Sequence, residues 1–196
     1  MSKPKVEDHI IENQMVISAL FHAAVHIIDR VILICCLDCG MRAGEVAHME
    51  RSWWDGRFIN IPAKRPCTCS ECNSSKRAEL KKGTWTPKTK QAIRSIPVRD
   101  QYRSYLTQLF TQHKEFPVSR VRIWQRVKRL QEVAGVRGNI FPHALRGTYI
   151  TDLLDKGVTE AVVRELVGHV SIATTSKYSR FGKDRLERQL KEKVWT

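Results

Sequence analysis

The sequence lacks an apolar segment long enough to cross a membrane. A transmembrane helix needs roughly 18 consecutive apolar residues, whereas the most apolar segment, residues 31–37, is short and is flanked by Asp29, Arg30 and Asp38. The first eight residues, MSKPKVED, are polar and mixed in charge, unlike a secretory signal. Internal repeats, low-complexity tracts and evident interdomain linkers are also missing. The sequence therefore predicts an intracellular, cytoplasmic protein.

Acidic residues are scarce in this chain. There are 20 Asp and Glu residues against 34 Lys and Arg residues, which gives a formal net charge of +14. A surface this basic favours a polyanionic partner, and nucleic acid is the usual one. Charge alone leaves ribosomal, RNA-binding and anionic-membrane proteins open. The length of 196 residues and the hydrophobic content of 42% suffice for a globular domain with its own core.

Helical periodicity dominates both ends of the chain. It predicts helices over residues 6–28, 31–37, a short segment from Ala43, a region from Asp100 onward, 119–134, 143–155, 159–167 and 183–194. In the helix over 119–134 an apolar stripe is expected to face the core. Its members are Val121, Trp124, Val127, Leu130 and Ala134. The opposite face carries Arg120, Arg122, Arg126 and Arg129, either solvated or turned toward phosphate.

The middle of the chain has the alternation typical of strands. Residues 57–61 follow the turn signal Asp55-Gly56, and residues 93–98 alternate in the same way. Between them lies a loop rich in Cys, Ser, Lys and Gly. The pattern predicts a mainly α fold with a small antiparallel β-sheet (α+β) that carries an irregular insertion.

Six cysteines divide into two groups. Cys35, Cys36 and Cys39 lie in an apolar stretch and are expected in the core. A polar loop holds the second group, Cys67, Cys69 and Cys72. Three thiolates with one further ligand would make a structural zinc site, and that ligand could be His48, Cys39 or a residue of another chain. Reduced surface thiols or a conditional disulfide are the alternatives.

Several polar residues recur along the chain as a set. Each of them taken alone would be an ordinary surface or packing residue. In chain order they are Arg42 in GMRAGEV, Lys88 in PKTK, Arg94 in RSIP, the pair His143 and Arg146 in HALR, His169 in LVGH, and Tyr178 in TTSKY. Their combined order and spacing is hard to assign to chance. It resembles that of the tyrosine recombinases, or phage integrases, over residues 28–181. The cysteine cluster followed by WTPKT resembles a variant found in archaeal or archaeal-virus members.

This resemblance implies a catalytic domain of the DNA breaking-rejoining type. It implies catalytic roles for six residues: Arg42, Lys88, His143, Arg146, His169 and the nucleophile Tyr178. The two arginines would clamp the pentavalent phosphate, and His143 would accept the tyrosine proton. His169 would donate to the phosphate. Lys88 would protonate the 5′ leaving oxygen, with Lys82 and Lys90 as competitors.

The product of that reaction would be a 3′-phosphotyrosyl link, formed without ATP or a catalytic metal. Tyr149 follows the His-x-x-Arg box directly and is interpreted as a core residue. Glu45 is interpreted as structural, since it can orient Arg42 or cap a helix.

The resemblance further implies a double-stranded DNA partner with an attachment-type site and a homo-oligomer, a tetrameric synapse, on that DNA. We expect residues 1–196 to form a single catalytic domain without an N-terminal core-binding domain, either as a fragment or as a reduced family member. Residues 183–196 are expected to form a C-terminal tail helix. The rival functions are a topoisomerase of type IB, a catalytically silent DNA-binding regulator of the same fold, and a zinc-ribbon nucleic-acid module.

Overall fold

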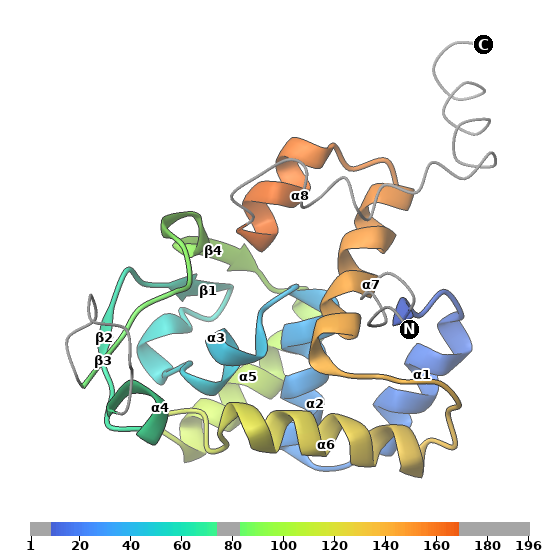
Figure 1. Ribbon diagram of the computed structural model, residues 1–196, viewed down its shortest axis with the longest axis horizontal. Helices are drawn as coiled ribbons and strands as arrows, with labels where there is room; N and C mark the ends of the chain where they lie inside the picture. The colour runs from blue at the N-terminus through green and yellow to red at the C-terminus, as the bar shows by residue number, and fades with distance from the viewer. Residues whose placement is uncertain (1–8, 74–82, 169–196) are drawn as a thin grey trace, which may run out of the picture.

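The computed structural model describes residues 9–73 and 83–168 of the chain. These residues form eight α-helices and two short antiparallel strand pairs (Figure 1). The helices are α1 (Gln14–Ala23), α2 (Ile27–Leu33), α3 (Ala43–Ala47), α4 (Ser70–Asn73), α5 (Asp100–Gln112), α6 (Arg120–Val133), α7 (Pro142–Asp155) and α8 (Glu160–Val167). The strands are β1 (Phe58–Ile61), β2 (Arg65–Pro66), β3 (Thr84–Trp85) and β4 (Arg94–Pro97). The expected α+β fold class is confirmed.

The first expected helix is interrupted, so the prediction of one helix through residue 28 was wrong. Helix α1 ends at Ala23, and α2 begins at Ile27 after the N-cap His26, whose ring accepts a hydrogen bond from the Ile28 amide. Arg30 stabilises the interruption between α1 and α2, because its guanidinium donates to the carbonyls of Ala24 (3.1 Å) and Phe21 (3.3 Å). These bonds satisfy carbonyls that a continuous helix would have paired internally.

The buried helix expected over 31–37 continues α2 as a π-helical turn, Ile34–Asp38, and stops before Gly40. Gly40 has φ of +58°, a conformation in which side chains other than glycine are strained. A Cβ atom here would also lie 2.5 Å from the Tyr149 ring. The turn therefore needs glycine for two reasons, and it sends the chain directly toward α3.

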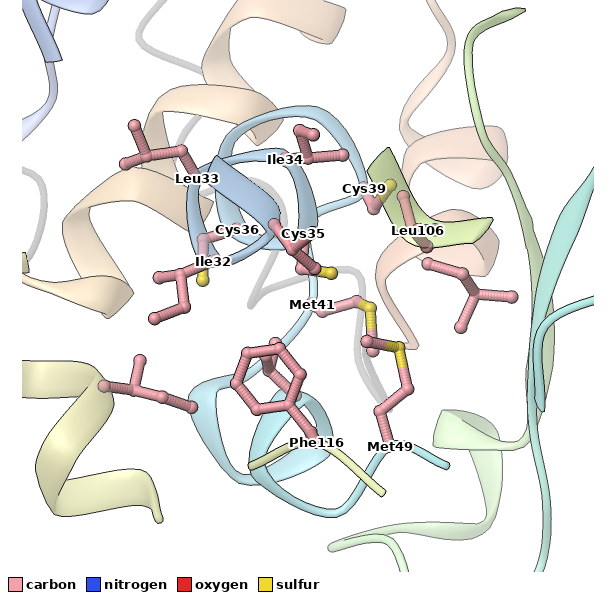
Figure 2. Packing of buried hydrophobic residues seen from close by; sticks show 14 of the residues in the cluster. Ile32, Leu33, Ile34, Cys35, Cys36, Cys39, Met41, Met49, Leu106 and Phe116 are labelled. Atoms are coloured by element: carbon pink, nitrogen blue, oxygen red, sulfur yellow. The ribbon is translucent and has the colours of Figure 1, made fainter. Parts of the chain in front are cut away.

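The core is built around this α2–π segment (Figure 2). Cys35, Cys36 and Cys39 are fully buried there, as expected, and pack with Met41 and Met49. Tyr149 is also buried, at 7% exposure, which confirms its interpretation as a core residue. Burial of each large apolar side chain stabilises the fold by about 1.5–3 kcal/mol.

Strands β1 and β4 pair in the region where the sheet was expected, with Ile59 opposite Ile96 and Ile61 opposite Arg94. The insertion between them is more regular than expected. Strand β2 pairs with β3, and α4 follows β2. The Cys67 amide donates to the Gly83 carbonyl at 2.8 Å and extends this second pairing. The β2–β3 pair and α4 therefore give the insertion a regular structure, and its cysteines lie in or next to these elements.

Helix α6 begins after the N-cap Ser119, close to the expected start, but its buried face differs from the expected stripe. Ile123, Val127 and Leu130 are buried, whereas Val121 is 59% and Trp124 50% exposed. Val127 and Leu130 belong to both possible stripes, so the period alone left the rotation of the helix ambiguous. Lys128 lies over the Trp124 ring at 5.5 Å and covers part of it.

None of the helices in residues 9–73 and 83–168 is long and apolar enough to span a membrane. Several expectations fall outside those residues. They concern Lys82, His169, Tyr178, the first residues of the predicted helix over 6–28, and the tail helix over 183–196.

Candidate active site

Arg42 stands at the start of α3, where Glu45 fixes it. The backbone amide of Arg42 donates to Glu45 Oε2 at 2.9 Å, and its guanidinium donates from Nη1 to Oε1 at 2.8 Å. Glu45 therefore caps the helix and orients the arginine at once, as the sequence suggested. The side chain of Arg42 retains 20% exposure, so the guanidinium remains accessible from solvent.

Arg146 lies on α7 and is buried, at 3% exposure. Its Nη1 donates to the Gly40 carbonyl, and its Nη2 donates to the Val167 carbonyl at 2.7 Å. A guanidinium presents its donors in a rigid plane. These bonds consequently fix the direction of the whole group between the turn at Gly40 and the end of α8.

The C-terminal end of α8 is the point where three arginines meet. The carbonyls of Leu166, Val167 and Gly168 accept hydrogen bonds from Arg94, Arg146 and Arg42, respectively, at 2.7, 2.7 and 3.0 Å. The last carbonyls of a helix lack partners within the helix and carry its partial negative charge. Cationic side chains here stabilise α8 and are held in place by it.

Gly168 terminates α8 in the left-handed conformation, with φ of +65°. A Cβ atom at this position would lie 2.8 Å from the carbonyl oxygen of Gln91 and 2.9 Å from the Cα of Ala92. Both atoms belong to the backbone and cannot move aside easily. Glycine is therefore required for α8 to approach the segment that precedes β4.

Arg94 was noted in the sequence without a role, and the structure gives it one. Its side chain is 5% exposed, and its Nη2 pairs with Glu45 Oε2 at 3.0 Å. Burial by itself would raise the pKa of Glu45, but the charges of Arg94, Arg146 and Arg42 together lower it below its ordinary value. The carboxylate is therefore ionised at neutral pH and holds the arginines together. A partner 49 residues away along the chain leaves no local signal in the sequence.

His143 is the second residue of α7 and remains open to solvent. Desolvation of its ring lowers its pKa below the ordinary value of 6.5. The positive charges of Arg146, Arg42 and Lys88 lower the pKa further. A neutral imidazole can accept a proton, which suits a general base. His143 stands three residues before Arg146 on the same helix, and Arg146 and Arg42 both donate to the end of α8.

Lys88 is exposed and lies between β3 and the 3-10 turn Lys90–Ala92. Its charge is among those that lower the pKa of His143. His169 and Tyr178, the other two expected site residues, lie outside the described residues. Their roles stay predictions.

The cysteines of the insertion meet at a separate place. The side chains of His48, Cys67, Cys69 and Cys72 gather with all four potential ligand atoms within 4.8 Å of one another. The sequence left the fourth member open between His48, Cys39 and another chain. Cys39 lies in the core instead, and His48 stands at the end of α3.

Comparison with known proteins identifies the family. The model of the phage integrase family matches residues 12–185. The chain therefore belongs to the phage integrase family, which confirms the resemblance found in the sequence. The tyrosine recombinase XerD of Corynebacterium glutamicum is 36% identical over 94 residues, which cover 48% of this chain and 30% of that protein. XerD of Pseudomonas putida is 35% identical over 79 residues, covering 40% and 26%.

Solved structures show the same fold. The crystal structure of XerA recombinase superposes with a TM-score of 0.72 at 18% identity, over 99% of this chain and 66% of that one. The Tn1549 transposon integrase in complex with a circular intermediate DNA gives a TM-score of 0.73 at 18% identity, over 97% and 67%. The matched segments span less than a third of the XerD relatives.

Proposed function

We propose that this chain is the catalytic domain of a site-specific DNA recombinase that cleaves and rejoins strands through a 3′-phosphotyrosyl intermediate on Tyr178. The observation that carries the proposal is the convergence of Arg42 and Arg146 at the C-terminal end of α8, with His143 three residues before Arg146 on α7. Membership of the phage integrase family supports the same function.

The two arginines are proposed to bind the scissile phosphate. Attack on a phosphodiester places extra negative charge on its nonbridging oxygens, and a guanidinium matches two such oxygens. Arg42 and Arg146 both reach the end of α8, so their guanidinium groups lie near each other. A phosphate bound by both must share or displace the carbonyl oxygens of Val167 and Gly168.

The proton transfers follow from the charges. The oxygen of Tyr178 forms a bond to phosphorus while its proton passes to the neutral imidazole of His143. The bond from phosphorus to the 5′ oxygen breaks, and that oxygen takes a proton from Lys88. In the rejoining step a 5′ hydroxyl attacks the phosphotyrosyl link, and each proton returns. His169 is proposed as a further donor to the phosphate. No ATP or catalytic metal takes part in these steps.

The proposed partner is double-stranded DNA with an attachment-type site, which places the protein inside the cell with that DNA. We also propose that four chains act together in a synapse of two duplexes. Sedimentation of the protein with its selected site would show a mass of four chains and two duplexes. Sedimentation as one chain per duplex at all concentrations would contradict the tetramer.

A nicked suicide duplex tests the proposal. Duplexes bound by the protein are first selected from a random-sequence pool, and they are then remade with one nick at successive positions. Cleavage just upstream of a nick releases a short fragment and traps the protein on DNA. A label at the 5′ end of the cut strand should stay with the protein in a denaturing gel, because the link forms at a 3′ phosphate.

Two tyrosine variants are the matched pair. Tyr178→Phe should bind the selected duplex and form no adduct, whereas Tyr149→Phe changes a buried tyrosine of α7 and should still form it. Binding without any adduct in the wild-type protein would favour a silent regulator. Relaxation of a supercoiled plasmid that lacks the selected site would favour a type IB topoisomerase.

A further inference from the structure

The cysteines of the insertion and His48 are spaced like the ligands of a metal ion. The imidazole Nε2 of His48 lies 3.4 Å from Cys69 Sγ and 3.5 Å from Cys72 Sγ. In a tetrahedral zinc centre with Zn–S of about 2.3 Å and Zn–N of about 2.05 Å, the nitrogen and sulfur ligands are about 3.6 Å apart. The observed spacing is therefore that of ligands around one ion.

The ring of His48 is oriented for ligation. Its Nδ1 lies 2.7 Å from the Gly44 carbonyl oxygen. A carbonyl only accepts hydrogen bonds, so Nδ1 carries the proton and Nε2 presents its lone pair to the sulfurs. A backbone carbonyl that fixes the tautomer in this way is typical of metal-binding histidines. The ring also stacks on Trp85, with centroids 5.3 Å apart.

The loop that holds the sulfurs is fixed as well. The Cys72 amide donates to Cys69 Sγ at 3.4 Å, and the Cys67 amide is bound to Gly83 across the β2–β3 pair. Cys67, Cys72 and His48 are buried at 5%, 8% and 6% exposure. Two of the three thiols, those of Cys67 and Cys72, are therefore buried together with the imidazole that faces them.

We infer that His48, Cys67, Cys69 and Cys72 form a structural zinc site. Three thiolates and one imidazole complete a tetrahedron and leave no open position, so the ion would be structural and not catalytic. His48 follows the last residue of α3, and the three cysteines belong to the insertion. The ion would thus fasten the insertion between β1 and β4 to the end of α3, the helix that Arg42 precedes.

Metal content tests this inference on the whole chain. Protein made in zinc-supplemented medium and dialysed against a mild chelator should hold about one zinc ion per chain. His48→Ala and Cys69→Ser should lose most of it. Cys39→Ala is the matched control, since it removes a buried thiol from the core and was the rival fourth ligand, and it should keep the zinc. Circular dichroism verifies that each variant is folded.

Cobalt replacement provides a second measurement that needs no variant. Co²⁺ added to the metal-free wild-type protein should give the visible absorption of a tetrahedral cobalt centre and a thiolate charge-transfer band, and zinc should abolish both. The inference would be overturned if the folded wild-type protein contained no zinc and showed no such absorption after cobalt was added. A disulfide within the cluster in protein purified under reducing conditions, or loss of zinc from Cys39→Ala with retention in His48→Ala, would overturn it as well. None of these results bears on the recombinase activity.

Discussion

Replacement of Arg94 by methionine is expected to destabilise the folded protein strongly. The methionine side chain fills a similar volume but leaves Glu45, a carboxylate with 3% exposure, without its nearest buried partner. Removal of one member of a buried ion pair costs about 3–5 kcal/mol, because the remaining charge stays desolvated. Arg94 also donates to the carbonyls of Leu166 and Ala92, whereas Arg42 stays paired with Glu45 at 2.8 Å, so the loss should lie within that range.

Urea denaturation measures the effect as a shift of the midpoint. The matched control is Lys156→Ala, which breaks the exposed pair with Asp152, whose side chains are 61% and 41% exposed. An exposed i,i+4 pair contributes about 0.3–0.5 kcal/mol. A change for Arg94→Met as small as that for Lys156→Ala would refute the reasoning that Arg94 holds Glu45.

The dependence on pH follows from the pKa of Glu45. In the wild-type protein that pKa is lowered, so the carboxylate contributes stability above its ordinary pKa, which is lost as pH falls through the folded value. Without Arg94, the largest of the charges that lower this pKa is lost, so the pKa of Glu45 should rise. The deficit of Arg94→Met relative to wild type should therefore shrink below about pH 4.5, the ordinary range of glutamate. Glu45→Gln in the same chain should recover part of the loss at neutral pH.

Further predictions concern catalysis and binding. Arg42→Ala and Arg146→Ala should each slow adduct formation by at least about 100-fold. Arg146→Lys should restore little of the rate, because lysine lacks the bidentate fork of arginine. A near-normal rate for Arg146→Lys would contradict the proposal that the two arginines clamp the phosphate. The acid limb of the cleavage rate should have its midpoint below 6.5, since the pKa of His143 is lowered and its neutral form is the base; a limb unchanged in His143→Gln would remove that role. Lys88→Ala should recover on a substrate with a 5′-bridging sulfur, which needs little protonation, while Lys90→Ala should cleave normally on either; recovery of Lys90→Ala instead would reassign the acid. With roughly 6 phosphate contacts, a plot of the logarithm of the DNA association constant against the logarithm of the salt concentration should have a slope of about −5. A slope near zero would exclude DNA as the target of the basic surface.

Local patterns were sufficient for much of the fold. The helix that starts near Ala43, the strand that follows Asp55-Gly56 and the helix with the His-x-x-Arg box lie near their expected places, because caps, turns and periodicity act over a few residues. The role of Glu45 followed from its position three residues after Arg42. The burial of Tyr149 followed from its place after the box.

Relationships between distant residues could not be predicted in this way. The pairing of Arg94 with Glu45 could not be predicted, because Arg94 is also held by the end of α8, whose position is known only in the folded chain. The choice of His48 over Cys39 beside the cysteines depends on where α3 ends. The rotation of α6 was ambiguous because Val127 and Leu130 fit two stripes. In each case the missing information is the packing of one element on another.

Mass-spectrometric mapping of the trapped adduct tests the central claim most directly. The suicide duplex is digested with nuclease after trapping, the protein is cleaved to peptides, and the residue that carries a 3′-linked nucleotide is located. The recombinase mechanism predicts that the modified residue is Tyr178 and that Tyr149→Phe gives the same modified peptide. A nucleotide on any other residue, or an adduct that persists in Tyr178→Phe, would contradict it.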